Sequence, residues 1–464
     1  MGAHVYKTIR ELSDGIRGKK ISPVELTETS LERLEEIGPR YNAVVTVTRE
    51  RAISEAETAE DEIRSGTYRG PLHGVPYGAK DLLATSGGIP TSWGAAPLRN
   101  QTFEEDATVI RKLREAGAVL TAKLAMIEFA GGMGYRQPHA TFTGPPRNPW
   151  DPETWTGGSS SGSGASVSAG LVPFAIGSET WGSILSPANN CGVAGLRPTY
   201  GRVSRAGAMA LSYTLDKLGP LCLTADDCGL VLEAIAGSDP ADPSTSNEHY
   251  SYETSKEGFR LAILKDGTEG INEEVGANFQ GALETLGEFA TIEEVEFPDL
   301  PYEAITRIIL SAEAASAHEE FIESGRTSEL TAPEDHYGAY PRMVVLAKDY
   351  IRAMRLRAKM ARAVDEVMSG FDAVVAPTSR RVASPIDEEF RRTSPGTSRD
   401  TMGAVGNGAG LPSISVPSGF TDAGLPTGIQ FMGRAYAENT VIAIAKGYQE
   451  RTDWHVRHPA ETTP

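Results

Sequence analysis

Two serine–glycine clusters and one lysine are the residues of this sequence whose types and spacing suit catalysis. The clusters read G-G-S-S-S-G-S-G, from Gly157 to Gly164, and G-S-E-T-W-G-S-I, from Gly177 to Ile184. Upstream, the segment G-V-P-Y-G-A-K-D places Lys80 beside Asp81. A serine hydroxyl is a weak nucleophile at neutral pH and needs a base in contact with it. Because no histidine lies inside either cluster, the pattern predicts a serine hydrolase whose base is the amine of Lys80.

A lysine acts as a base only when it is uncharged. Its ordinary pKa of ~10.4 must fall by ~3 units, equivalent to ~4 kcal/mol, which requires burial or a neighbouring cation. Lys80 follows an apolar segment that predicts a buried strand. The alternative is a surface ion pair between Lys80 and Asp81 or another carboxylate.

The glycines around the serines predict a sharp turn whose backbone amides converge on an oxyanion at Ser183. A flexible linker is the alternative for the first cluster, but the apolar segment that follows it is atypical of a solvated linker. Gly158, Ser160 and Gly162 also match the G-x-S-x-G nucleophile elbow, which would need a downstream histidine such as His455 or His458.

The bulk composition excludes several classes of protein. A net charge of −18 over 464 residues disfavours nucleic acid and anionic membranes as main partners. Three cysteines, Cys191, Cys222 and Cys228, argue against a disulfide framework, and no Cys/His spacing predicts a metal site. Cys191, close to the second cluster, is expected to be a small buried side chain. We expect no cofactor, since water is the only second substrate needed.

The N-terminus lacks an apolar signal region, and no apolar run approaches the ~18 residues needed to span a bilayer. A cytoplasmic protein without membrane contact is therefore expected, as a monomer or a homodimer.

The elements that must position these residues alternate between short strands and helices, which predicts one α/β domain over residues 1–464. Residues 1–65 are expected to form a helical arm and residues 66–236 the catalytic core. A helical, cap-like segment over 237–370 and a return to the sheet over 371–464 complete the division. Ser22 and Glu25, with a proline between them, predict a capped helix, and Asp106 is expected to cap a helix that ends at Gly117.

The expected strands share short apolar runs bounded by turn residues. They cover residues 75–80, 118–123, 260–264, 291–297, 373–376, 413–416 and 428–432.

At these residues the chain resembles the amidase signature family. The resemblance rests on both serine clusters, on C-G-V-A-G-L-R-P-T from Cys191 to Thr199, and on A-G-L-P-S-I-S-V-P from Ala409. It covers most of the chain and is weakest between about 240 and 370. It implies an α/β/α sandwich with a mixed central sheet covered by helices on both faces.

The resemblance also implies a Ser-cisSer-Lys triad. Ser183 would be the nucleophile, Ser159 the bridging serine after a cis peptide bond, and Lys80 the general base. Ser160 would support this network. The backbone amides of residues 180–183, namely Thr180, Trp181, Gly182 and Ser183, would form the oxyanion hole.

Three departures from the family pattern bear on the substrate. Trp181 stands where glycine is usual, Glu179 replaces an aspartate, and Leu185 replaces an arginine that often follows. Tryptophan would be strained if its position required a positive φ. Loss of the arginine disfavours a carboxylate-bearing substrate. Expected pocket side chains are aromatic or flexible, although each could equally belong to the core: Phe129, Met133, Tyr135, Phe142, Trp181 and Leu185.

The resulting hypothesis is an amidohydrolase for neutral, hydrophobic or aryl amides, with esters or carbamates as further substrates. A second hypothesis is a glutamine-hydrolysing protein that resembles the A-type component of glutamyl-tRNA amidotransferase, in which Asp400 would match the acid that binds the substrate amine. The segment T-Y-G-R-V-S-R from Thr199 supports that resemblance. A third is a binding protein without catalysis, which the presence of all three triad positions disfavours.

Overall fold

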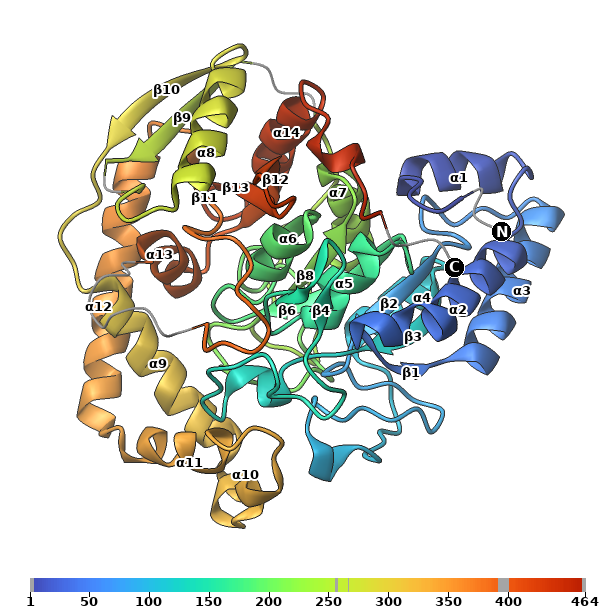
Figure 1. Ribbon diagram of the computed structural model, residues 1–464, viewed down its shortest axis with the longest axis horizontal. Helices are drawn as coiled ribbons and strands as arrows, with labels where there is room; N and C mark the ends of the chain where they lie inside the picture. Colours follow the sequence, from blue (N-terminus) through green and yellow to red (C-terminus); the bar gives the residue numbers. More distant parts are fainter. Residues whose placement is uncertain (1–3, 255–257, 266, 391–399, 461–464) are drawn as a thin grey trace.

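The computed structural model describes residues 4–254, 258–265, 267–390 and 400–460. At its centre lies one mixed sheet of eleven strands, in the order β1-β3-β2-β6-β8-β7-β12-β13-β11-β9-β10. Parallel pairs lie near both ends of the sheet, between β3, β2 and β6 and between β11, β9 and β10, whereas the central pairs are antiparallel. The arrangement is the α/β fold with a mixed sheet that the sequence predicts (Figure 1).

The strands are mostly four to eight residues long. Their bounds are β1 Val44–Val47, β2 Pro76–Lys80, β3 Val119–Leu124, β4 Arg147–Asn148, β5 Asp151–Trp155, β6 Phe174–Glu179, β7 Ala194–Arg197, β8 Lys217–Cys222, β9 Phe259–Leu264, β10 Ala290–Val295, β11 Ala373–Pro377, β12 Ser413–Phe420 and β13 Pro426–Met432. Strands β4 and β5 pair with each other in a separate hairpin.

Helices flank the sheet along its length (Figure 1). Their bounds are α1 Ile9–Arg17, α2 Pro23–Glu36, α3 Arg49–Ser65, α4 Thr108–Glu115, α5 Ser161–Ser168, α6 Leu185–Cys191, α7 Ala225–Ile235, α8 Glu273–Leu286, α9 Tyr302–Ala317, α10 Glu319–Glu323, α11 Asp335–Gly338, α12 Ala347–Met368, α13 Thr401–Ala409 and α14 Glu438–Gln449.

The two faces of the sheet are covered by different helices, because successive strand residues point to opposite sides. On β11, Ala373 and Val375 belong to a core that includes side chains of α4, α7, α8 and α14. Val374 and Ala376, on the opposite face, pack with α9, α12 and α13. Farther along the sheet, this second face is covered by α2, α5 and α6. Both faces of the sheet are therefore buried under helices.

Most of the predicted strands are present within one or two residues of their expected bounds. Strand β1 lies inside the segment that the sequence predicts to be helical, and it pairs antiparallel with β3. Strands β6, β7 and β8 are also missing from the predicted set, although they form the centre of the sheet. Each of the four predicted segments contributes at least one strand to the sheet, so the fold is continuous across them.

Helix caps show where local patterns hold and where tertiary contacts replace them. Ser22 caps α2 by accepting a hydrogen bond from the Glu25 amide at 3.2 Å, with Pro23 at the first helical position. The expectation for Asp106 is wrong, because the cap of α4 is Ala107. The Asp106 carboxylate instead accepts hydrogen bonds from Arg51 at 2.9 and 3.0 Å and from the Ser86 amide at 2.8 Å.

Among the residues that the structure describes, no helix combines the length and apolar character needed to cross a bilayer.

Close packing of the central strands predicts a sensitivity to substitution at Gly219 in β8. A Cβ at this position would collide with the carbonyl oxygen of Leu196 on the neighbouring β7. We expect Gly219→Ala to lower the free energy of unfolding by about 1–3 kcal/mol, as overpacking does in well-packed cores. Urea unfolding followed by circular dichroism measures the change.

Gly281→Ala is the matched control, because a Cβ at this position in α8 meets no atom within 4 Å. Alanine is the better helix former by about 0.8–1.0 kcal/mol, so this variant should be as stable as the wild type or more so. Equal unfolding midpoints for the two variants would contradict the proposed crowding at Gly219.

Candidate active site

The candidate catalytic side chains lie where two neighbouring strands end. Strands β2 and β6 are parallel, so their carboxyl ends share one edge of the sheet. Lys80 is the last residue of β2, and Ser178 and Glu179 are the last two of β6. The two serine clusters begin next to this edge, at the start of α5 and in the turn between β6 and α6.

The side-chain amine of Lys80 is fully buried and is surrounded by hydroxyl groups. Its Nζ lies 2.7 Å from Oγ of Ser159, 3.0 Å from Oγ of Ser160 and 3.0 Å from Oγ of Ser178. The structure thus brings together three of the residues named from the sequence, Lys80, Ser159 and Ser160, and adds Ser178. A nitrogen in this position is in contact with hydroxyls and has no exposure to solvent.

Burial lowers the pKa of Lys80 well below its ordinary value, and Asp216 and Glu179 offset part of that shift. The expected alternative, an ion pair between Lys80 and Asp81, does not form. Asp81 pairs with Lys123 at 3.0 Å and accepts a hydrogen bond from the Ser92 amide at 2.9 Å. Among the described residues, no carboxylate contacts the buried Lys80 amine, which favours its uncharged form.

Hydrogen bonds of the Ser160 amide and hydroxyl hold the two serine clusters against each other. The Ser160 amide donates to the carbonyl of Ser183 at 3.2 Å, and the hydroxyl of Ser160 donates to the carbonyl of Ser178 at 3.1 Å. The Ser178 amide donates back to Oγ of Ser160 at 3.2 Å. The peptide bond between Gly158 and Ser159 is cis, as the resemblance implies.

The turn at residues 180–183 has the backbone shape that its glycine requires. Gly182 has φ +81°, a conformation that favours glycine, whereas Trp181 is not among the residues with positive φ. The strain anticipated for tryptophan is therefore absent from this described turn. None of the four amides from 180 to 183 donates a hydrogen bond to another group of the described chain, so all four stay available to a ligand.

A buried ion pair fixes the residues on either side of this turn. The Glu179 carboxylate accepts hydrogen bonds from the amides of Ile184 at 2.9 Å and Leu185 at 3.0 Å. Its other oxygen accepts from Nη1 of Arg197 at 2.8 Å. Burial alone raises the pKa of Glu179, but the charges of Arg197 and Lys217 overcome this effect and lower it to about 2. Glu179 is thus a charged brace under the turn.

A large cleft of about 1030 Å³ opens beside the turn. Gly158, Trp181, Gly182 and Leu185 border it, which places both serine clusters on its wall. Its outer part carries charges of both signs, from Arg380, Arg381, Glu388 and Glu389.

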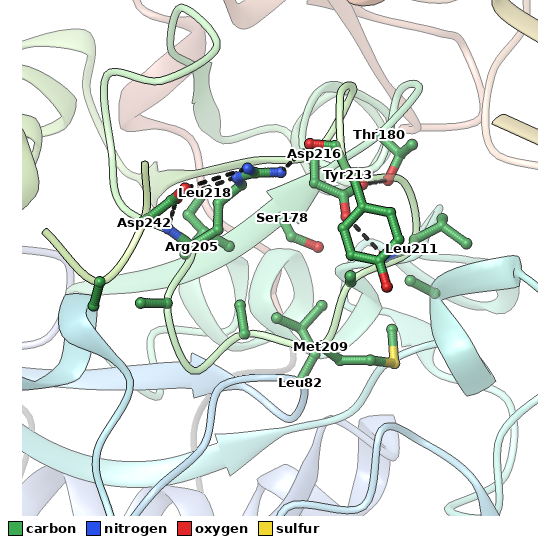
Figure 2. A pocket seen from close by; sticks show the side chains of 15 residues that line it. Leu82, Ser178, Thr180, Arg205, Met209, Leu211, Tyr213, Asp216, Leu218 and Asp242 are labelled. Atoms are coloured by element: carbon green, nitrogen blue, oxygen red, sulfur yellow. Dashed lines mark hydrogen bonds and ion pairs between the residues drawn. The ribbon is translucent and has the colours of Figure 1, made fainter. Parts of the chain in front are cut away.

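A second, smaller cavity of about 190 Å³ reaches the same network from another side. Ser178 and Thr180 line it, together with Leu82, Met209 and Tyr213 (Figure 2). Ser178 and Glu179 are consecutive on β6 and therefore point to opposite faces of the sheet. Because Ser178 faces the small cavity and Glu179 the large cleft, the turn lies between two openings.

The structure separates the expected pocket side chains into two groups. Tyr135, Trp181 and Leu185 line the large cleft. Phe129 and Met133 are fully buried in the main core, where Phe129 packs on Phe321 with ring centroids 4.6 Å apart. The pocket expectation does not hold for these two side chains, because zero exposed surface leaves them nothing to offer a ligand.

Phe142, also expected in the pocket, lies under the guanidinium of Arg99 at 5.9 Å.

The histidines required by the nucleophile-elbow alternative lie elsewhere. His458 stacks on Tyr6 with ring centroids 3.7 Å apart, and His455 lies in a short turn, Trp454–Val456. Ser160, the serine of that motif, contacts Lys80 and Ser178. The geometry does not support the elbow with either histidine.

Cys191, Cys222 and Cys228 are buried and free. Within the described ranges, no group of three or more His, Cys, Asp or Glu side chains is placed to hold a metal ion.

Sequence reasoning missed Ser178, Asp216 and the pairing of Trp181 with Asp400. Asp216 accepts a hydrogen bond from the Thr180 hydroxyl and from the amides of Leu211 and Ser212. Ser178 stands one residue before Glu179 in the second cluster, so its place at the strand end could have signalled a role. The other contacts join segments far apart in the chain and have no local signal.

The chain thus combines a mixed sheet between helical layers with two serine clusters that contact a buried lysine. The sequence profile described as Amidase matches residues 25–442. The chain belongs to the amidase family, as the sequence motifs predict.

Known relatives include amidases as well as components of amidotransferases. The chain is 34% identical to the A-type component of glutamyl-tRNA(Gln) amidotransferase from Geobacillus thermodenitrificans, over 97% of this chain and 98% of that protein. It is 35% identical to the A-type component from Coxiella burnetii, over 98% of this chain and 99% of that protein. Among solved structures, it matches native peptide amidase from Stenotrophomonas maltophilia with a TM-score of 0.88 and 30% identity over both full chains. The A-type component from Thermotoga maritima matches with a TM-score of 0.78 and 32% identity, over 97% of this chain and 96% of that one.

The brace formed by Glu179 predicts a pH-dependent contribution to stability. We expect Glu179→Gln to lower the free energy of unfolding by about 3–5 kcal/mol at neutral pH, because it leaves the Arg197 charge buried without its partner. A carboxyl whose pKa falls from 4.5 to about 2 on folding stabilises the protein above pH 4.5, and this contribution is lost as the pH falls toward 2. The difference between variant and wild type should therefore shrink over that range in urea unfolding.

Glu296→Gln provides the control, since Glu296 forms an exposed pair with Lys265. Its melting temperature should equal that of the wild type at neutral pH. A Glu179→Gln protein as stable as this control would show that the Arg197 pair does not brace the turn.

Proposed function

We propose that the chain is an amidohydrolase that cleaves neutral, hydrophobic or aryl amides through an acyl-enzyme on Ser183. Lys80 is the general base in this proposal, and Ser159 passes the proton between Lys80 and Ser183. Ser160 positions the two serine clusters. The amides of residues 180–183 bind the oxyanion.

The single observation that carries the proposal is the environment of the Lys80 amine. An uncharged amine has two N–H groups and one lone pair. Ser160 already donates its own proton to the carbonyl of Ser178, so Ser160 accepts from Lys80. The lone pair is then available to a hydroxyl proton, and the contact to Ser159 is the shortest, at 2.7 Å. A hydroxyl that gives its proton to Lys80 can in turn take one from its neighbour.

Acylation in this scheme forms one bond and breaks another. Oγ of Ser183 bonds to the substrate carbonyl carbon while its proton moves to Ser159 and the Ser159 proton moves to Lys80. The oxyanion that develops accepts hydrogen bonds from the free amides of the turn. The tetrahedral species collapses by breaking the C–N bond, and the amine leaves with the proton that Lys80 returns through Ser159.

Deacylation repeats these steps with water in place of the amine. Water bonds to the acyl carbon and gives its proton to the same relay. The bond between the acyl carbon and Ser183 then breaks, and Ser183 recovers its proton as the acid leaves. No cofactor is needed, because water is the only other reactant.

The large cleft supports a neutral and partly apolar substrate. Tyr135, Trp155 and Leu185 supply apolar surface on its wall. Among the charges that line it, the two arginines Arg380 and Arg381 balance the two glutamates Glu388 and Glu389. Esters and carbamates present the same carbonyl to Ser183 and are proposed as further substrates.

A glutamine-hydrolysing component of an amidotransferase is the second candidate, favoured by the 34–35% identity to such A-type components along nearly the whole chain. The overall shape favours the first candidate, since the TM-score is 0.88 with the peptide amidase and 0.78 with the A-type component from Thermotoga maritima. Glutamine hydrolysis that depends on a co-purifying partner would establish the second candidate instead. For the first candidate, we propose a cytoplasmic monomer or homodimer that makes no contact with nucleic acid.

Ser183→Ala tests the nucleophile. We expect the purified wild type to hydrolyse a hydrophobic anilide, and the variant to lose that turnover while its melting temperature is unchanged, because the hydroxyl that forms the acyl-enzyme is gone. Hydroxylamine should trap the acyl group in the wild type and should trap none in the variant. Turnover by Ser183→Ala would remove Ser183 from the proposal, and a wild type inactive on anilides, amides, esters and carbamates alike would favour a binding protein.

Lys80→Ala tests the base. We expect kcat/KM to fall by a factor on the order of 10² or more, the range for lost acid–base catalysis. In the wild type, Lys80 must be uncharged, so kcat/KM should rise with pH through the depressed lysine pKa and then level off. The variant should lose this acid limb.

His139→Ala is the control for a histidine base, since His139 is a partly exposed histidine whose nearest carboxylate, Glu334, is 3.9 Å away. It should retain wild-type kcat/KM and pH dependence. A loss as large as that of Ser183→Ala would point to a histidine in place of Lys80.

A further inference from the structure

The tryptophan of the turn at residues 180–183 has a partner far away in the sequence. Nε1 of Trp181 donates a hydrogen bond to Oδ2 of Asp400 at 2.7 Å. Both residues line the large cleft, on the same wall as Gly158 and Gly182. Trp181 comes two residues before Ser183 in the same turn, and it lines the cleft in which the proposed substrate would lie.

Asp400 is held firmly by groups other than cations. Its Oδ1 accepts a hydrogen bond from the Gly403 amide at 2.9 Å, which caps α13. Its backbone amide donates to Oε1 of Glu303 at 2.6 Å. Among the residues that the structure describes, Asp400 forms no ion pair. Within the described residues, Asp400 is thus a carboxylate in a cleft without a cationic partner, a group that would attract a substrate ammonium if Oδ2 were free.

The indole of Trp181 is fixed from its other side as well. The guanidinium of Arg307 lies over its ring, 5.4 Å from the centroid, and Arg307 is itself held by Glu303 at 3.7 Å. Trp181 therefore lies between a cation on its face and a carboxylate at its N–H. A ligand ammonium would have to displace the indole from Asp400 and would approach Arg307, a charge of its own sign.

We propose that Trp181 makes the cleft selective against amides that carry an ammonium group beside the scissile carbonyl, by occupying Oδ2 of Asp400. The preferred substrates are then amides whose neighbouring nitrogen is acylated or missing. This inference rests on the proposed amidohydrolase function and names its substrate class. Trp181 acts here on the choice of substrate, not on the bond-making steps.

The experiment compares two substrates that differ only in this charge, L-phenylalaninamide and N-acetyl-L-phenylalaninamide. It is run at pH 6.5, below the ~7.7 pKa of an α-amino group, where the first substrate carries its ammonium. The wild type should prefer the acetylated amide. Trp181→Phe keeps the aromatic ring over which Arg307 lies but removes the N–H, so Asp400 becomes free to bind the ammonium. The ratio of kcat/KM for the ammonium substrate over the acetylated one should rise by about threefold to fivefold, near the upper end of what an exposed ion pair allows.

The double variant Trp181→Phe/Asp400→Asn is the matched control. It has the same altered ring but no carboxylate, so its ratio should return to the wild-type value. In Trp181→Phe, the gain should also decline as the pH rises through the α-amino pKa, which a change of shape alone would not produce. An unchanged ratio in Trp181→Phe, or a gain that persists in the double variant or at high pH, would overturn the inference.

Binding separates this inference from the proposed function. If the wild type hydrolyses neither amide, the choice of substrate for the proposed reaction is wrong. Calorimetry on Ser183→Ala then still measures how Trp181 affects the affinity for each amide. Ser183→Ala/Trp181→Phe should bind phenylalaninamide about fivefold more tightly than Ser183→Ala does, with no gain for the acetylated amide. Equal affinities for phenylalaninamide would reject the role of Trp181 irrespective of turnover.

Discussion

The site depends on an amine that is buried among hydroxyls and that no carboxylate of the described chain contacts. Three serine oxygens within 2.7–3.0 Å satisfy Nζ of Lys80 without supplying the negative charge that would hold its proton. The neighbouring Asp81, which would charge the lysine if it faced the same way, is turned to Lys123 on the adjacent strand. Lys80 ends β2 and Asp81 follows it, so two consecutive ionisable side chains reach different partners, and the burial of Lys80 favours an uncharged amine.

Charges that lie deeper in the fold shape the loop that faces this amine. Glu179 ties two backbone amides after the turn to Arg197 on β7, so the turn is held between strands at the middle of the sheet. No group of the described chain accepts a hydrogen bond from the amides within the turn, which is costly in a folded protein unless water or a ligand satisfies them. A rigid brace on one side and unpaired donors on the other are what a preorganised anion site requires.

Much of the site could be predicted from short motifs, because Lys80, Ser159 and Ser160 stand in segments whose glycine pattern is itself informative. The strands with strong apolar runs, such as β11, were equally predictable. Strands β6 and β8 were missed, because glycine, serine and proline in the middle of their sequences obscure the apolar pattern of strands that are buried on both sides. Phe129 was assigned to a pocket because an aromatic side chain near a catalytic motif suits a pocket wall and a core equally well. Partners such as Asp400 lie more than two hundred residues from Trp181, and only the folded chain brings them together.

The two openings on either side of the turn have a kinetic consequence. The large cleft and the small cavity share no lining residue, and Ser178 connects the latter directly to the lysine. In the proposed reaction, an ester intermediate would fill the cleft and leave the cavity, which Ser178 and Thr180 line, as a separate opening beside the same network (Figure 2). A bulky product could then leave through the cleft while water enters through the cavity. The order in which the two cleavage fragments leave would then not be set by a single opening.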